Sequence, residues 1–174
     1  GNRTLMNEKK INLNNYKDKI KEFENSGKTT MIVSENGKVI GVIAVADAIK
    51  EDSVEAIAKL NEKGYQTIMI TGDNENTAKA IAKQVGIREV IANVLPEDKE
   101  KKVVELQKNG FVAFVGDGIN DAPALKQSNV GIAMGSGTDI AIEAGDLVLV
   151  SSSLSGVVQA INLSKAPFRK IKQN

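Results

Sequence analysis

The feature that most constrains this chain is a regular alternation of short apolar runs and helical patterns from about Thr67 onward. Five apolar runs predict strands, at residues 67–71, 90–94, 111–116, 130–134 and 147–150. Helices are predicted between them at 74–85, 97–108 and 121–127, with a shorter one at 139–144. Strand–helix alternation at this spacing is typical of βαβ units, so the sequence predicts an α/β fold with a doubly wound parallel sheet.

The first 46 residues follow a different pattern. A polar helix is predicted over 14–23, and apolar runs at 30–34 and 39–46 flank the tetrapeptide Glu35-Asn36-Gly37-Lys38. Asn-Gly is the strongest short signal for a β-hairpin. We therefore expect an N-terminal antiparallel α+β piece, residues 1–46, followed by a parallel α/β domain over residues 47–174. The last stretch, 154–174, predicts a single helix that becomes basic toward its end.

Composition excludes several kinds of site. The chain has no Cys and no His, which removes disulfides, thiol nucleophiles, imidazole bases and the usual soft-metal ligands. A bound metal is therefore expected to be a hard ion on carboxylates and carbonyls, with Mg²⁺ the first candidate. The 23 basic and 22 acidic residues nearly cancel and aromatic residues are scarce at 3%, so no nucleic-acid partner is expected.

The longest apolar run, residues 39–46, is far too short to span a bilayer. The chain opens with Gly1 and shows no signal peptide, which predicts a piece of a longer protein.

The densest motif is Gly116-Asp117-Gly118-Ile119-Asn120-Asp121-Ala122-Pro123. It follows the apolar strand at 111–115 and precedes a helix, so its carboxylates are expected at the carboxyl end of a strand, where open parallel sheets bind ligands. Asp117 and Asp121, separated by Gly and Asn, can direct several oxygens toward one hard divalent ion and its phosphate. The alternative is a plain turn in which Asp121 caps the next helix.

Two further polar groups stand in comparable positions. Thr71-Gly72-Asp73 joins a predicted strand to a helix, and its hydroxyl, bare backbone and helix N-terminus together make an anion cradle. The alternative is that Thr71 or Asp73 merely caps that helix. Lys99, in Pro96-Glu97-Asp98-Lys99, supplies an ammonium group of the kind that phosphoryl transfer needs, or else is a solvated surface charge.

Two glycine-containing segments are set aside. Ser26-Gly27-Lys28-Thr29 is similar to the end of a P-loop, but Glu22 stands where the first Gly is required, and a strand follows instead of a helix. The glycine-rich run at 131–137 lacks a dinucleotide-binding fingerprint, so we interpret it as a closely packed strand and loop beside the site.

Taken in order, the motifs at 71–73, 96–99 and 116–123 resemble the phosphorylation domain of P-type ATPases, which has the haloacid-dehalogenase-like fold. The likeness continues from 131 to 149 and covers roughly residues 40–174. The resemblance implies an ATPase and cation translocase that uses Mg²⁺ and ATP.

Three short segments extend the resemblance. Asp47-Ala48-Ile49-Lys50 is similar to the segment where the family chain re-enters this domain. Gly1-Asn2-Arg3 with Leu5-Met6 resembles the end of the nucleotide-binding domain in the heavy-metal branch, which assigns that domain to residues 1–46. Lys170-Ile171-Lys172-Gln173-Asn174 resembles the run into the next membrane helix of copper pumps. The resemblance thus implies heavy-metal transport, copper favoured, by a membrane protein of which this chain is a cytoplasmic part.

The resemblance also implies roles at the phosphate site. Asp117 is the implied Mg²⁺ ligand, with Asp121 and Asn120 supporting the metal and the phosphate. Lys99 neutralises the transferred phosphate, and Thr71 binds the phosphoryl oxygens. In this scheme Lys99, Thr71 and Asp121 are the catalytic residues of this chain.

The implied nucleotide contacts come from two places in the sequence. Gly72 binds phosphoryl oxygens beside Thr71, and Asp73 lies near the nucleotide. Gly1 and Asn2 contact ATP in the heavy-metal branch.

One family element is missing. The aspartyl nucleophile of the family lies in Asp-Lys-Thr-Gly-Thr after the central strand, and this chain contains no such segment. We expect the chain alone to be inactive as an ATPase and to depend on the rest of the pump, namely the upstream nucleophile strand, the actuator domain and the membrane helices. Two alternatives remain at this point: a free-standing phosphatase of the same fold that uses Asp47, and a non-catalytic regulatory module that binds phosphate or nucleotide.

Overall fold

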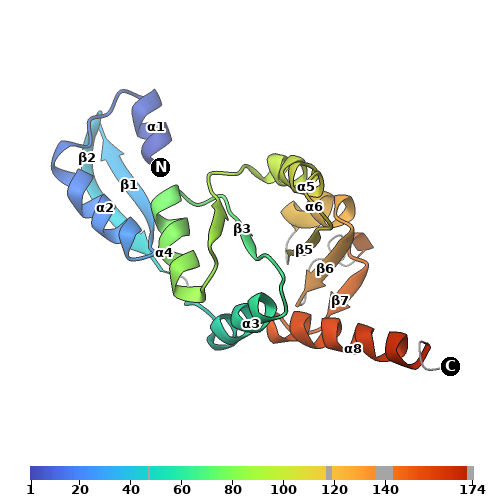
Figure 1. The fold of residues 1–174 in the computed structure, drawn as a ribbon. Helices are drawn as coiled ribbons and strands as arrows, with labels where there is room; N and C mark the ends of the chain where they lie inside the picture. The colour runs from blue at the N-terminus through green and yellow to red at the C-terminus, as the bar shows by residue number, and fades with distance from the viewer. Residues whose placement is uncertain (47, 117–118, 136–142, 172–174) are drawn as a thin grey trace. The chain divides into compact units, whose positions relative to one another are not determined.

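A computed structural model describes residues 1–46, 48–116, 119–135 and 143–171 of the chain (Figure 1). The chain forms two compact units. Unit 1 comprises Gly1–Ile49 and Ile68–Asn93, and unit 2 comprises Lys50–Thr67 and Val94–Asn174.

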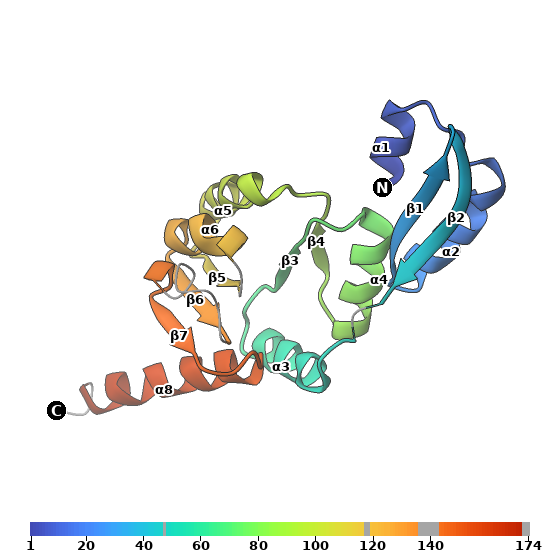
Figure 2. The same ribbon diagram turned by 180° about the vertical axis from the view of Figure 1, so that it is seen from behind.

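Unit 1 contains an antiparallel hairpin, a parallel strand pair and helices that pack against them. Its elements are α1 (Arg3–Glu8), the 3₁₀ turn η1 (Asn14–Tyr16), α2 (Lys17–Asn25), β1 (Thr29–Glu35), β2 (Lys38–Val45), β3 (Ile68–Ile70), α4 (Glu75–Val85) and β4 (Glu89–Ile91). Figure 2 shows the hairpin from behind, with α2 along β1. The core joins Met6, Leu13, Ile20 and Ile32, which places the buried face of β1 against α2.

The hairpin turn confirms the prediction from Asn36-Gly37. Both residues have positive φ, 48° at Asn36 and 76° at Gly37, and Glu35 pairs with Lys38 across the turn. A two-residue turn with positive φ at both central positions matches the right-handed twist of the strands, and only Gly and Asn adopt it readily.

The second half of unit 1 is a parallel βαβ piece. Ile68 pairs with Glu89 and Ile70 with Ile91, with α4 between the two strands in sequence. Helix α4 begins at the N-cap Asn74, whose side chain accepts from two backbone N–H groups, and ends at Gly86 in the left-handed conformation.

Unit 2 contains a three-stranded parallel sheet in the order β5-β6-β7. Its elements are α3 (Glu51–Glu62), η2 (Pro96–Asp98), α5 (Lys99–Gln107), β5 (Ala113–Gly116), η3 (Ile119–Asp121), α6 (Ala122–Gln127), β6 (Val130–Met134), β7 (Leu147–Leu149) and α8 (Ser155–Ile171). Helix α6 packs so closely on β6 that a Cβ on Gly131 would lie 2.6 Å from the Leu125 carbonyl oxygen. This supports the interpretation of the glycine-rich run as a packed strand.

The predicted elements agree with the structure in kind and order, and the α/β class with parallel strands is confirmed. Each of the five predicted parallel strands is present, most with one or two residues fewer than predicted. Of the helix predicted at 139–144, residues 139–142 lie outside the described residues. Helices α1 and α3 were not predicted. The helix α3 nevertheless carries a helical pattern, because Ser53, Ala56, Ile57 and Leu60 are buried on one face.

The compact units do not coincide with the predicted domains. The predicted boundary near Asp47 falls close to the end of the first segment of unit 1, at Ile49, but residues 68–93 group with residues 1–49. Within the described strands, β3–β4 and β5–β6–β7 form separate ladders. The assignment of residues 1–46 to a nucleotide-binding domain therefore stays a prediction. No helix in the described part of the chain has the length and apolar character needed to cross a membrane.

Candidate functional site

Two predicted catalytic residues meet in unit 2. Lys99 is the first residue of α5, directly after η2, and Asp121 is the last residue of η3, directly before α6. The Lys99 Nζ donates to Asp121 Oδ1 at 2.6 Å, and the two side chains are 20% and 12% exposed. Because both groups lie largely out of water, their attraction is less screened than that of a surface pair. The alternative of Lys99 as a solvated surface charge is therefore wrong.

The carboxylate of Asp121 is not a helix cap. Asp121 occupies the N-cap position of α6 but makes no side-chain capping hydrogen bond. A Cβ on Gly116, the last residue of β5, would lie 2.8 Å from both Cβ and Oδ2 of Asp121. The strand must therefore end in glycine for the Asp121 carboxylate to lie against its carboxyl end. These contacts contradict the reading of this motif as a turn in which Asp121 only caps α6.

The predicted metal site is described only in part. Asp117 and Gly118 lie outside the described residues, and Asn120 is exposed. Within the described ranges, no group of three or more acidic side chains is arranged to hold a metal ion. The chemistry of the donors nevertheless fits a hard ion, because Asp121 offers carboxylate oxygens at a strand end. The role of Asp117 stays a prediction.

The Thr71-Gly72-Asp73 loop, in unit 1, is fixed by its own hydrogen bonds. Thr71 Oγ1 donates to Asp73 Oδ2 at 3.0 Å, and the Asp73 backbone N–H donates back to Thr71 Oγ1 at 3.1 Å. Thr29 Oγ1 donates to Asp73 Oδ1 at 3.0 Å. The cap of α4 is Asn74, so the alternative that Thr71 or Asp73 caps this helix is wrong. Gly72 is exposed between them.

The predicted ATP contacts at the start of the chain also lie in unit 1. The Gly1 nitrogen donates to the Ile32 carbonyl at 2.8 Å, and the Ile32 N–H donates to the Gly1 carbonyl at 2.7 Å. Asn2 caps α1, its Oδ1 accepting from the Leu5 N–H at 2.9 Å. Gly1 is thus paired to β1 like a strand residue, and both Gly1 and Asn2 remain exposed.

A third polar cluster was not predicted from the sequence. Oδ2 of Asp52 on α3 accepts from Ser153 Oγ at 2.5 Å and from the N–H and Oγ of Ser155, both at 2.9 Å. These bonds, the one from Ser153 first, lower the pKa of the Asp52 carboxyl from its ordinary 3.8 to about 2. Lys50 Nζ adds a bond to the Ser152 carbonyl at 2.7 Å. The cluster fastens α3 to the start of α8.

A surface hollow lies between α3 and α8, lined by residues that include Glu55, Lys59, Val158 and Asn162. None of the predicted site residues lines it. The hollow therefore adds nothing to the phosphate site.

Comparisons with known proteins identify the family. Two family models, each described as a haloacid dehalogenase-like hydrolase, match residues 1–129 and 101–161. The chain belongs to the haloacid dehalogenase-like hydrolase family.

Within that family the similar proteins are heavy-metal P-type ATPases. A copper-exporting P-type ATPase from Staphylococcus haemolyticus (strain JCSC1435) is 50% identical over 175 residues, which cover 100% of this chain and 22% of that protein. The crystal structure of a zinc-transporting PIB-type ATPase in the E2.Pi state aligns with a TM-score of 0.76 at 44% identity, covering 93% of this chain and 27% of that one. The predicted resemblance to heavy-metal P-type ATPases is confirmed, and the chain spans about a fifth of the length of the copper-exporting relative.

A further solved structure concerns conformational changes in the catalytic domain of the CPx-ATPase CopB-B upon nucleotide binding. It aligns with a TM-score of 0.59 at 32% identity, covering 75% of this chain and 52% of that chain. The likeness therefore extends to a catalytic domain studied with a nucleotide.

Proposed function

We propose that the protein containing this chain is an ATP-driven heavy-metal pump with copper as its cargo, and that this chain supplies the phosphate-handling part of its catalytic site. The observation that carries the proposal is the Lys99–Asp121 pair at the carboxyl end of β5, within the motif order of a P-type ATPase. An ammonium and a carboxylate held together out of bulk water suit a site where phosphate charge must be balanced.

The reaction would proceed in two steps. An aspartate carboxylate outside this chain attacks the γ-phosphorus of ATP, the bond between the γ-phosphorus and the bridging oxygen breaks, and ADP leaves. Water then attacks the aspartyl phosphate, which releases inorganic phosphate and regenerates the carboxylate.

The residues of this chain position and neutralise the phosphoryl group. Asp117 and Asp121 would hold Mg²⁺, which when bound offsets charge on the phosphoryl oxygens. Lys99 fixes the orientation of the Asp121 carboxylate and adds a positive charge beside it. In unit 1, Thr71 and Gly72 would offer a hydroxyl and an open backbone to phosphate oxygens.

Copper is proposed as the cargo on two grounds. The similar proteins include a copper exporter that is 50% identical, and the sequence at 170–174 resembles that of copper pumps. A zinc transporter also aligns well in structure, so the cargo needs a direct measurement.

The test is acyl-phosphate formation by the full-length protein from labelled ATP, with Cu⁺, Zn²⁺ or Cd²⁺ added singly. We expect hydroxylamine-sensitive labelling that rises with Cu⁺. Labelling that rises only with Zn²⁺ or Cd²⁺ would overturn copper as the cargo, while the proposal of a heavy-metal pump would stand. Absence of an acyl phosphate with every metal would overturn the pump itself.

A further inference from the structure

A buried carboxylate in unit 1 has no part in the chemistry described so far. Glu24 is 1% exposed and lies one helical turn after Ile20, so that it shares the apolar face of α2. A carboxylate taken out of water at such a position is unfavourable unless hydrogen bonds and an opposite charge replace its hydration. The partners of Glu24 therefore show which segments its carboxylate holds together.

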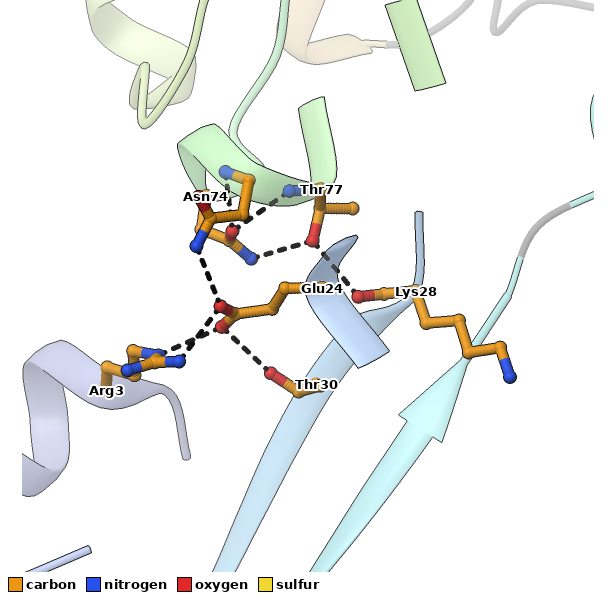
Figure 3. A network of polar contacts seen from close by, with 7 residues as sticks. Arg3, Glu24, Lys28, Thr30, Asn74 and Thr77 are labelled. Atoms are coloured by element: carbon orange, nitrogen blue, oxygen red, sulfur yellow. Dashed lines mark hydrogen bonds and ion pairs between the residues drawn. The ribbon is translucent and has the colours of Figure 1, made fainter. Parts of the chain in front are cut away.

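The partners of Glu24 come from three other elements, and Figure 3 labels two of these partners, Arg3 and Thr30. Arg3 of α1 forms a bidentate pair, Nε to Oε1 and Nη2 to Oε2, both at 3.0 Å. Thr30 Oγ1 of β1 donates to Oε1 at 3.4 Å, and Asn76 Nδ2 of α4 donates to Oε2 at 3.2 Å. Each carboxylate oxygen thus accepts from two donors, and a single side chain joins α1, β1 and α4 to α2.

The connection to α4 is reinforced beside Glu24. Thr77, which is fully buried, donates from Oγ1 to the Lys28 carbonyl at 3.0 Å and accepts from Asn74 Nδ2 at 2.9 Å. Together with the bond from Thr29 to Asp73, these contacts fix residues 73–77 against residues 24–30. The Thr71-Gly72-Asp73 loop is held at its far end by the same network.

The connection to α1 depends more heavily on Glu24. Helix α1 has six residues, a length that is marginal for a helix on its own. Arg3 is its first residue and follows directly after Gly1 and Asn2. Asn2 caps the same helix, because its Oδ1 accepts from the Leu5 N–H at 2.9 Å. The Gly1-Asn2 backbone is therefore held on one side by its pairing with Ile32 and on the other by α1, which the Arg3 fork ties to Glu24.

We propose that Glu24 is a positioning residue for nucleotide binding, which holds the Gly1-Asn2 segment through Arg3 and the first turn of α4, next to Asp73, through Asn76. This inference rests on the proposed function, because ATP is the ligand that these segments would contact. It assigns to Glu24 and Arg3 an effect on the capture of ATP that is separate from the phosphoryl chemistry around Asp121.

The effect on ATP capture has a definite form. Glu24→Gln keeps the size of the side chain but removes the charge and one acceptor, so that Arg3 loses its bidentate partner. The Gly1-Asn2 segment is then less well positioned, and ATP binds more weakly in the ground state and the transition state alike. Uniform weakening raises KM and leaves kcat, so we expect a KM for ATP about tenfold higher with kcat within about twofold.

The experiment measures KM and kcat for ATP in metal-stimulated hydrolysis by the full-length protein. Three variants probe the network: Glu24→Gln, Arg3→Lys and Asn76→Ala. Arg3→Lys keeps the positive charge but loses the bidentate fork. Asn76→Ala removes the exposed donor on α4. We expect the KM to rise in all three, most for Glu24→Gln and least for Asn76→Ala. Glu55→Gln is the matched control, because it removes an exposed carboxylate paired with Lys59, and its KM should not change.

The outcomes separate this inference from the proposed function. An unchanged KM in Arg3→Lys and Asn76→Ala would overturn it, even if Glu24→Gln failed to fold. A fall in kcat at unchanged KM in Glu24→Gln would also overturn it, since that result means fewer active molecules or a slower chemical step and not weaker ATP capture. If the wild-type protein formed no phosphoenzyme and hydrolysed no ATP, the proposed function itself would fail.

Discussion

Unit 1 and unit 2 each hold a cation–carboxylate pair whose carboxylate is shielded from solvent, and the two pairs are built differently. In unit 1 the Arg3 fork meets both oxygens of Glu24, and two further donors complete the shell. In unit 2 the point charge of Lys99 meets one oxygen of Asp121. A rigid planar fork suits a fixed joint, whereas an ammonium on a flexible stem can shift toward a phosphate. The geometry of each pair thus fits the role proposed for it, positioning in unit 1 and phosphate chemistry in unit 2.

The largest effect is expected at the unit 2 pair. Asp121→Asn removes the negative charge that faces Lys99, and we expect phosphoenzyme formation by the full-length protein to fall about 100-fold or more. The measurement is the initial rate of labelling from ATP. The separate variant Lys99→Arg should also form the phosphoenzyme more slowly than the wild type, because a guanidinium does not reproduce the compact charge of an ammonium. Near-normal labelling in Asp121→Asn would place this pair outside the catalytic site.

The unit 1 pair should matter more for local stability than for chemistry. Arg3→Ala leaves the Glu24 carboxylate buried without its cation, and we expect local destabilisation of α1 by about 2 kcal/mol, because Arg3 itself is partly exposed. Hydrogen exchange on the full-length protein measures this at the amides of Met6 and Ile11. Faster exchange there, with unchanged exchange at the amides of β6, is the expected pattern. Equal acceleration in both places would contradict a local joint.

The Asp52 cluster gives a third contrast, because it fastens helices without an ion pair. The folded pKa of Asp52 is depressed, so its contribution is complete above the ordinary value of 3.8 and is lost as the pH falls from about 4 to about 2. Asp52→Asn should lower stability by about 1 kcal/mol at neutral pH, since the group is partly exposed. Hydrogen exchange at the first turns of α8 should show this difference at pH 7. An undiminished difference at pH 2 would contradict the assignment.

The smallest effect is expected at the hairpin turn. Gly37→Ala forces a residue with a Cβ into φ 76°, at a cost of about 1 kcal/mol, without touching either ion pair. The KM for ATP should therefore stay at its wild-type value while exchange at the amides of β1 and β2 rises. A raised KM in this variant would show that general loosening of unit 1 mimics the Glu24 effect.

Local signals made part of this structure predictable. Asn36-Gly37 determines the hairpin through backbone sterics alone, and the octapeptide at 116–123 places Asp121 at a strand end by its position after an apolar run. The order of the three phosphate motifs then identified the family. The pairing of Lys99 with Asp121 was not predicted, because neither residue contains information about the other.

Long-range partners were not predictable in the same way. Glu24 receives donors that lie 21 and 52 residues away in the sequence, and nothing local signals them. The only hint is an acidic residue on the apolar face of α2, one turn after Ile20. Helix α1 is too short to produce a periodic pattern. The grouping of residues 68–93 with residues 1–49 likewise depends on tertiary packing, which the strand–helix pattern does not encode.

The most direct test of the division between the two pairs is phosphorylation of the full-length protein by labelled inorganic phosphate and Mg²⁺ in the absence of nucleotide. This reaction reverses the hydrolysis step and requires the phosphate site but not the nucleotide contacts. We predict near-wild-type labelling in Glu24→Gln and little or none in Asp121→Asn. Equal loss of labelling in both variants would contradict the account, because Glu24 would then act on the chemistry and not on nucleotide capture.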